Sequence, residues 1–208
     1  MKKARSIGAF VVVFGLWLVP VASPAAELRG GLKIGFTLTD IHGSDVRDFP
    51  YYDDPDTSWF LRSGFCGGGF VTVDLSENAA IQAEALIFTK GSEQFGIYDV
   101  YAFRTTYLEI PLLMKLVSRP GRSVASFFAG PALGILLSGS MTNDEEPIPF
   151  EGFKSKDWGI VFGLDWAIKS RVVIDLRYTK GLSKFIEMDG EPLAIKNTAI
   201  TLMVGYIF

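Results

Sequence analysis

The sequence predicts an all-β fold, an eight-stranded antiparallel transmembrane up-and-down β-barrel. Apolar residues recur at every second position in eight segments, which is the period of a β-strand with two unlike faces. The connections between these segments alternate between long and short, as in barrels with short turns at one rim and long loops at the other. Four connections are expected to be long loops: Thr39 to Ser58, Gly91 to Phe103, Met141 to Lys156 and Ser183 to Lys196.

Residues 1–25 have the features of a secretory signal peptide. A short basic stretch at residues 2–5 is followed by an uncharged apolar run from Ile7 to Val19, and small residues surround Ala25. A basic region, an apolar region and a small-residue cleavage site in this order form an export signal. We expect cleavage after Ala25 or one residue later, which leaves residues 26–208 as a single barrel domain.

The composition excludes several classes of protein. Cleavage of the signal would remove three basic residues and no acidic ones, taking the net charge from −3 to −6, so a basic surface for nucleic acid is not expected. Cys66 is the single cysteine, so no intramolecular disulfide can form. Hydrophobic residues make up 49% of the sequence. After the signal, however, no apolar run reaches the about 20 residues that a membrane-spanning helix needs.

The C-terminal segment has the clearest alternation. A last strand with apolar residues at alternate positions and an aromatic residue at its end resembles the C-terminal signature of outer-membrane barrels, which their assembly machinery recognises. We therefore expect this strand to bind the barrel-assembly machinery. Its apolar face carries Ile200, Leu202, Val204, Tyr206 and Phe208.

The opposite faces of the predicted strands carry charges of both signs. An outward Lys or Arg would cost about 2–4 kcal/mol at the bilayer midplane, so the charged faces are expected to point into the barrel. An eight-stranded barrel is just wide enough to be filled by its own side chains. We therefore expect a polar core in which these charges pair across the lumen: Lys33, Asp74, Glu84, Glu109, Lys115, Asp165, Asp175 and Arg177.

Aromatic residues lie near the ends of several predicted strands. Rings at such positions form the girdles that mark the boundaries between lipid and water in membrane barrels. The expected girdle residues are Trp59, Phe60, Tyr107, Trp158, Trp166, Tyr178, Tyr206 and Phe208.

Three segments resemble the PorT-like outer-membrane β-barrel family, also described as the porin family or the outer membrane protein β-barrel domain. Gly31 to Phe36 reads GLKIGF and is similar to the family's opening G-x-K-x-G strand. Tyr107 to Lys115 reads YLEIPLLMK and is similar to its YLEIPLLLK strand, and Phe128 to Pro131 resembles the strand that follows. The resemblance implies a barrel in the outer membrane of a Gram-negative cell. The family has no general catalytic residues, so we expect neither an enzyme nor a cofactor or metal.

The leading interpretation is a structural or interaction protein with a filled lumen and acidic external loops. We expect it to be a monomer surrounded by outer-membrane lipids and lipopolysaccharide. A narrow channel for small solutes is one alternative, and a soluble periplasmic barrel is another. A lipid A-modifying enzyme is a third, because His42 and Ser44 lie close together with Asp40 and Asp45 nearby.

The first long loop is acidic. Carboxylate oxygens bind calcium, and a divalent cation could bridge them to lipopolysaccharide phosphates, but their spacing matches no known calcium loop. We interpret the segment as a solvated acidic loop. Its carboxylates include Asp45, Asp48, Asp53, Asp54 and Asp56.

Overall fold

The fold is all-β in the part of the chain that the computed structural model describes. The described residues are 28–44, 58–95, 100–143, 146–148, 152–184, 186–188 and 191–208. Their strands are β1 (Leu28–His42), β2 (Ser58–Ser76), β3 (Ala79–Phe95), β4 (Val100–Ser118), β5 (Val124–Asn143), β6 (Glu146–Ile148), β7 (Lys156–Ile168), β8 (Val172–Gly181), β9 (Glu187–Met188), β10 (Glu191–Pro192) and β11 (Lys196–Ile207). Among these residues, no helix is long and apolar enough to cross a membrane. The predicted signal peptide (residues 1–25) and the acidic residues 45–57 lie outside the described residues.

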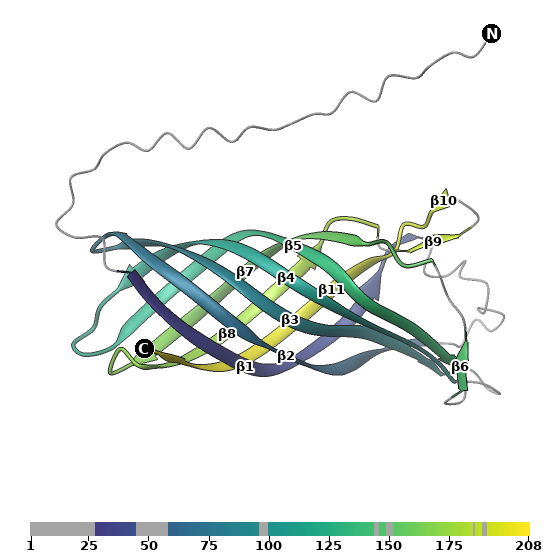
Figure 1. Cartoon of the computed structure of the whole chain (residues 1–208), viewed down its shortest axis with the longest axis horizontal. Coiled ribbons are helices and arrows are strands. Elements are labelled where there is room, and N and C mark those ends of the chain that lie inside the picture. Colours follow the sequence, from purple (N-terminus) through teal and green to yellow (C-terminus); the bar gives the residue numbers. More distant parts are fainter. Residues whose placement is uncertain are drawn as a thin grey trace, which may run out of the picture.

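Eight long antiparallel strands close into a barrel (Figure 1). They pair in the order β1, β2, β3, β4, β5, β7, β8 and β11, and β11 pairs back with β1. The closing ladder runs from Gly31 opposite Ile207 to His42 opposite Lys196. A closed barrel pairs its backbone groups with one another, as lipid requires because it offers no hydrogen-bond partners. The predicted eight-stranded barrel is therefore confirmed.

The two rims of the barrel differ. At one rim, residues 77–78, 119–123 and 169–171 connect β2 to β3, β4 to β5 and β7 to β8, and the C-terminus lies at the same rim (Figure 1). We call this the short-turn rim and the opposite one the loop rim. Because barrels of this kind have short periplasmic turns and longer external loops, we expect the short-turn rim to face the periplasm.

The strands near the loop rim are longer than the sequence predicts. β3 continues to Phe95 and β4 begins at Val100, so most of the loop expected at Gly91 to Phe103 is strand. The loop after β5 contains β6, which pairs with the end of β5, and the loop after β8 contains the β9–β10 hairpin. Antiparallel ladders can continue beyond the lipid, where no lipid requires an apolar outer face, so alternation of apolar residues gives no signal there.

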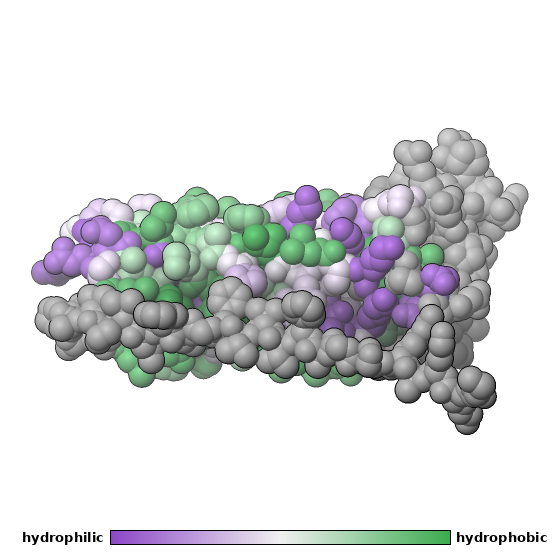
Figure 2. Space-filling model, turned by 90° about the horizontal axis from the view of Figure 1, so that it is seen from above, coloured by the Kyte–Doolittle hydropathy of each residue, from purple (hydrophilic) through white to green (hydrophobic). Residues whose placement is uncertain are grey.

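The middle of the outer face is apolar. On the face of the barrel seen in Figure 2, hydrophobic residues gather in the middle and hydrophilic residues lie on both sides of them along the barrel. The C-terminal strand contributes side chains that are 44–79% exposed on this face: Ile200, Leu202, Val204, Tyr206 and Phe208. A continuous apolar surface of this size faces lipid rather than water, which is inconsistent with a soluble periplasmic barrel.

Five of the eight expected girdle aromatics lie on the outer face: Trp158, Trp166, Tyr178, Tyr206 and Phe208 are 41–79% exposed. The side chains of Trp59 and Phe60 lie outside the described part of the structure. The prediction is wrong for Tyr107, which is fully buried inside the barrel. Two-residue alternation along β4 places its ring on the same inner face as the Glu109 side chain.

Candidate functional site

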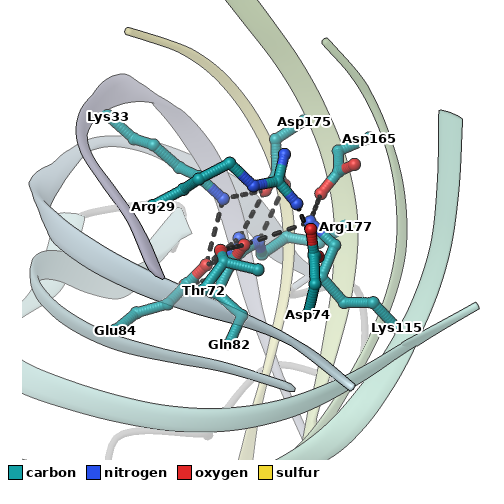
Figure 3. A network of polar contacts seen from close by, with 10 residues as sticks. All are labelled: Arg29, Lys33, Thr72, Asp74, Gln82, Glu84, Lys115, Asp165, Asp175 and Arg177. Atoms are coloured by element: carbon teal, nitrogen blue, oxygen red, sulfur yellow. Dashed lines mark hydrogen bonds and ion pairs between the residues drawn. The ribbon is translucent and has the colours of Figure 1, made fainter. Parts of the chain in front are cut away.

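Four charged side chains from three strands meet in the middle of the lumen (Figure 3). Nζ of Lys33 on β1 lies 3.0 Å from Oε1 of Glu84 on β3 and 2.6 Å from Oδ2 of Asp175 on β8. Arg177, also on β8, lies 2.7 Å from Oε2 of Glu84 and 2.6 Å from Oδ2 of Asp175. These four residues are at most 3% exposed. We call them the central quartet; its two cations balance its two carboxylates.

The strand period explains the geometry on β8. Asp175 and Arg177 are two residues apart, so both side chains point to the inner face. The Arg177 guanidinium donates from Nε (2.9 Å) and from Nη2 (2.6 Å) to the two oxygens of Asp175. Paired donors of this kind fix a carboxylate in both distance and orientation. The quartet therefore has a defined arrangement rather than a loose clustering of charge.

Gln82 extends the network toward the short-turn rim. Its side-chain Nε2 donates to Glu84 of the quartet. Its Oε1 accepts from Oγ1 of Thr72 at 2.8 Å and from Nζ of Lys115 at 3.0 Å. Lys115 in turn forms an ion pair with Asp165 at 2.5 Å. One neutral amide thus connects the quartet to a second buried ion pair.

Asp74 lies apart from the quartet, at the short-turn rim. Its two carboxylate oxygens pair with Arg29 at 2.7 Å and with Arg119 at 3.0 Å. Arg119 also donates to the backbone oxygen of Glu77. These contacts tie the start of β1 and the β4–β5 turn to the end of β2.

A third group of charges lies toward the loop rim. Lys90 on β3 forms an ion pair with Glu109, and its Nζ lies 3.6 Å from Oδ2 of Asp157. Asp157 also accepts hydrogen bonds from Oγ of Ser183 at 2.7 Å and Nδ2 of Asn197 at 3.2 Å. Sequence reasoning left Lys90 and Asp157 out of the polar core. The two-residue alternation could have identified them. Lys90 is an even number of residues from Glu84, so both side chains lie on the inner face of β3.

Aromatic rings fill the space around the inward cations. Lys33 Nζ lies 4.8 Å from the centroid of the Phe70 ring, and the Arg177 guanidinium lies 5.2 Å from that of Phe128. Lys90 Nζ lies 5.2 Å from the Tyr107 centroid. Cations over aromatic faces are attracted by the ring quadrupole, and the rings add packing volume. The lumen is therefore filled by rings as well as by ion pairs.

The predicted polar core is thus one network and two separate groups. The structure directs all eight predicted side chains inward. Six of them join the quartet or the Lys115–Asp165 pair, whereas Glu109 and Asp74 lie toward opposite rims.

His42, proposed above as part of an enzyme site, lies on the outer side of β1 near the loop rim. The apolar outward row of β1 ends at Leu38, so His42 lies beyond the lipid band. Its Nδ1 is 2.8 Å from Oγ1 of Thr198, and the Asp40 carboxylate accepts a hydrogen bond from the Ile41 amide. Partial burial, and then the nearby Lys180 and Lys196 ammonium groups, lower the pKa of His42. Ser44 is exposed, and Asp45 lies outside the described residues.

Comparison with known proteins identifies one matching family. The model of the family described as outer membrane protein beta-barrel domain matches residues 22–187. No curated protein matches the chain.

Several solved outer-membrane proteins are similar over most of the chain. Ail, the attachment invasion locus protein of Yersinia pestis, is 14% identical, covers 88% of this chain and 99% of its own, and has a TM-score of 0.45. OprG from Pseudomonas aeruginosa is 14% identical; the similarity covers 87% of this chain and 94% of OprG, with a TM-score of 0.41. Neisserial surface protein A is 9% identical; the similarity covers 86% of this chain and 97% of that protein, with a TM-score of 0.47.

Proposed function

We propose a closed scaffold in the outer membrane as the function of this chain, which belongs to the outer membrane protein β-barrel family. The observation that carries the proposal is the central quartet, which links β1, β3 and β8 across the lumen with both cations and both carboxylates paired. Breaking such a buried set leaves an uncompensated charge, which is costly, so the closed arrangement is strongly favoured. A closed lumen favours a structural or interaction role.

The packing around the quartet supports the same proposal. Leu86, Phe88 and Met203 form one buried apolar cluster, and Leu113 and Phe128 belong to another. Between the quartet and the short-turn rim, the lumen has a cavity of about 20 Å³, room for about one water molecule. Side chains that fill the barrel to this extent favour a closed lumen over a water-filled one.

Ion conductance across a planar bilayer tests the closed lumen against the channel alternative. We expect the wild-type barrel to give no steady conductance. The double variant Glu84→Ala with Arg177→Ala removes the link across the lumen, keeps the lumen electrically balanced and leaves Lys33 paired with Asp175. This variant should conduct if the quartet is what closes the barrel. Stable conductance of the wild-type protein would overturn the proposal in favour of a narrow channel.

The proposal includes no lipid A-modifying activity. The Nδ1 of His42 lies against the Thr198 hydroxyl, whereas a serine–histidine–aspartate site needs a carboxylate on one ring nitrogen and the serine on the other. Mass spectra of lipid A from cells that produce the wild type or His42→Ala should be identical. A modification that disappears in His42→Ala would establish the enzyme instead.

Export, assembly and partners complete the proposal. We propose that residues 1–25 are removed, so that the intact mass of the mature protein corresponds to a start at Ala26 or Glu27. The outward face of β11, which ends at Phe208, would bind the barrel-assembly machinery, and the monomer would contact phospholipid and lipopolysaccharide directly. An intact mass that includes residues 1–25 would contradict the export step.

Within the family, we propose membership of the PorT-like group. Its support is the GLKIGF and YLEIPLLMK segments. Their charged residues have structural partners in this barrel: Lys33 belongs to the quartet, Glu109 pairs with Lys90, and Lys115 pairs with Asp165. The resemblance therefore concerns how the lumen is filled and assigns no ligand.

A further inference from the structure

Two neighbouring turns at the short-turn rim carry exposed cations without acidic partners. Arg122 in the β4–β5 turn and Lys169 in the β7–β8 turn are both exposed, and neither makes an ion pair with any residue in the described part of the chain. β5 and β7 pair with Val124 opposite Ala167. Arg122 precedes Val124 by two residues and Lys169 follows Ala167 by two, so both cations lie at the same end of two paired strands. Like charges at the same rim favour an anion between them.

The other basic residues of these two turns have partners. Arg119 is bound to Asp74, and Arg171 donates from Nη1 to the Tyr206 hydroxyl at 3.2 Å. Lys169 occupies a turn position with φ of 49°, where Asn or Gly would be less strained. Within these two turns, the cations without such partners are therefore Arg122 and Lys169, next to the start of β5 and the end of β7.

An apolar groove of about 550 Å³ lies on the outer face beside these turns. Its lining includes Ala125 on β5, which lies between Ser118 on β4 and Trp166 on β7. Ala125 is directly opposite Trp166, and Phe127 is directly opposite Leu164. Ala125 and Ser118 have small side chains beside the much larger Phe127 and Trp166, and this difference in size leaves the groove. Two of its lining residues, Ser118 at the end of β4 and Ala125 near the start of β5, flank the turn that carries Arg122.

We propose that the groove and the two cations form one binding site for an anionic phospholipid of the periplasmic leaflet. Arg122 and Lys169 would hold the phosphate, and an acyl chain would lie along the groove over Ala125. Basic residues at a membrane surface attract anionic headgroups, and a tryptophan such as Trp166 belongs at the headgroup level. This inference rests on the proposed placement of the barrel in the outer membrane.

The position of the site favours a phospholipid over other anions. Lipopolysaccharide occupies the leaflet at the loop rim, away from these turns. A soluble acidic protein or a free phosphate could contact Arg122 and Lys169, but neither would use an apolar groove that faces lipid. Only a molecule with both an anionic head and an apolar chain contacts both parts of the site.

Native mass spectrometry of the full-length barrel in detergent tests the site. The probes are phosphatidylglycerol and phosphatidylethanolamine at equal concentration. We expect the wild type to retain phosphatidylglycerol preferentially. The double variant Arg122→Gln with Lys169→Gln should lower this retention on the order of tenfold, because each basic residue at a membrane surface contributes a severalfold preference. The matched control, Arg104→Gln with Lys156→Gln, removes an exposed arginine and lysine near the loop rim and should leave retention unchanged.

A second variant separates a lipid from a free anion. Ala125→Phe fills the groove and should also reduce phosphatidylglycerol retention, while binding of inorganic phosphate should be weak in every variant. If only the charge variant lost binding, or if inorganic phosphate competed fully, the site would be an anion site and the lipid proposal would be overturned. Equal retention of both lipids by the wild type would also overturn it. A heat-dependent gel shift shows that each variant is folded, and its absence in the wild type would instead refute the membrane barrel itself.

Discussion

Cys66 reports on access to the lumen at the scale of a single residue. Its side chain is 6% exposed and packs with Leu86, Phe88 and Met203 on the inner wall of the barrel. Because Cys66 is the only cysteine, a thiol reagent labels this position in the wild-type protein. The rate of labelling therefore shows whether water reaches the middle of the lumen.

We expect a water-soluble maleimide to leave Cys66 unmodified in the folded barrel and to modify it fully after heat unfolding, because buried thiols are inert. Mass spectrometry of the protein before and after heating measures the difference. A single cysteine placed at the exposed Ser170 in the Cys66→Ala background is the control for reagent activity. Rapid labelling of Cys66 in the folded protein would mean that the lumen is open to water.

His42 allows a prediction about pH. Because its pKa is lowered, the ring should be neutral at pH 7 and should take up a proton only below its ordinary pKa of 6.5. The neutral ring can accept a hydrogen bond from the Thr198 hydroxyl at Nδ1. The contribution of this hydrogen bond to the free energy of unfolding is therefore complete above pH 6.5 and is lost as the pH falls. NMR titration of the ring in micelles measures this, and Lys196→Gln should raise the pKa. A wild-type pKa above 6.5 would contradict the arrangement.

At the scale of strands, Gly68 explains how β1 reaches β3. Lys33 pairs in register with Gly68 on β2, and Gly68 has no side chain in the way. The Lys33 side chain can therefore cross β2 to Glu84. A Cβ atom on Gly68 would lie 2.0 Å from the backbone oxygen of Ala85, closer than real contacts allow.

We therefore expect Gly68→Ala to destabilise the barrel by about 1–3 kcal/mol, the usual cost of overpacking. Gly69→Ala is the matched control on the same strand. The nearest atoms to its Cβ would be 3.7 Å away, so its effect should be small. Urea unfolding in micelles measures both variants, and equal stabilities would show that close packing at Gly68 is not required.

The two-residue strand period predicted which side chains point inward, but it did not predict which inward side chains contact each other. On β7 and β11 it separated inward from outward side chains, because lipid on one side imposes strict alternation. It could not predict that Lys33 reaches Glu84 or that Glu109 pairs with Lys90, because these contacts depend on register and stagger between strands. The run Gly67–Gly69 weakened the pattern on β2, since glycine gives no sign of which face it occupies.

At the scale of the whole molecule, the position of an outward side chain along the barrel axis should determine how much a charge placed there lowers the free energy of unfolding. Leu202 lies outward near the middle of β11 and is 51% exposed, whereas Leu182 follows β8 at the loop rim and is 53% exposed. Their exposures are nearly equal, so in water an arginine at either position would cost little. In a bilayer, an outward arginine costs about 2–4 kcal/mol at the midplane and about 0–1 kcal/mol near the interface.

We therefore expect Leu202→Arg to reduce the free energy of unfolding in phospholipid bilayers by about 2–4 kcal/mol, and Leu182→Arg by at most about 1 kcal/mol. Reversible urea unfolding in vesicles, followed by tryptophan fluorescence, measures both. The outward Leu202 pairs with Phe36 on β1, which is itself outward, so no buried partner complicates the comparison. Equal costs at the two positions would mean that the apolar band is not centred in the bilayer.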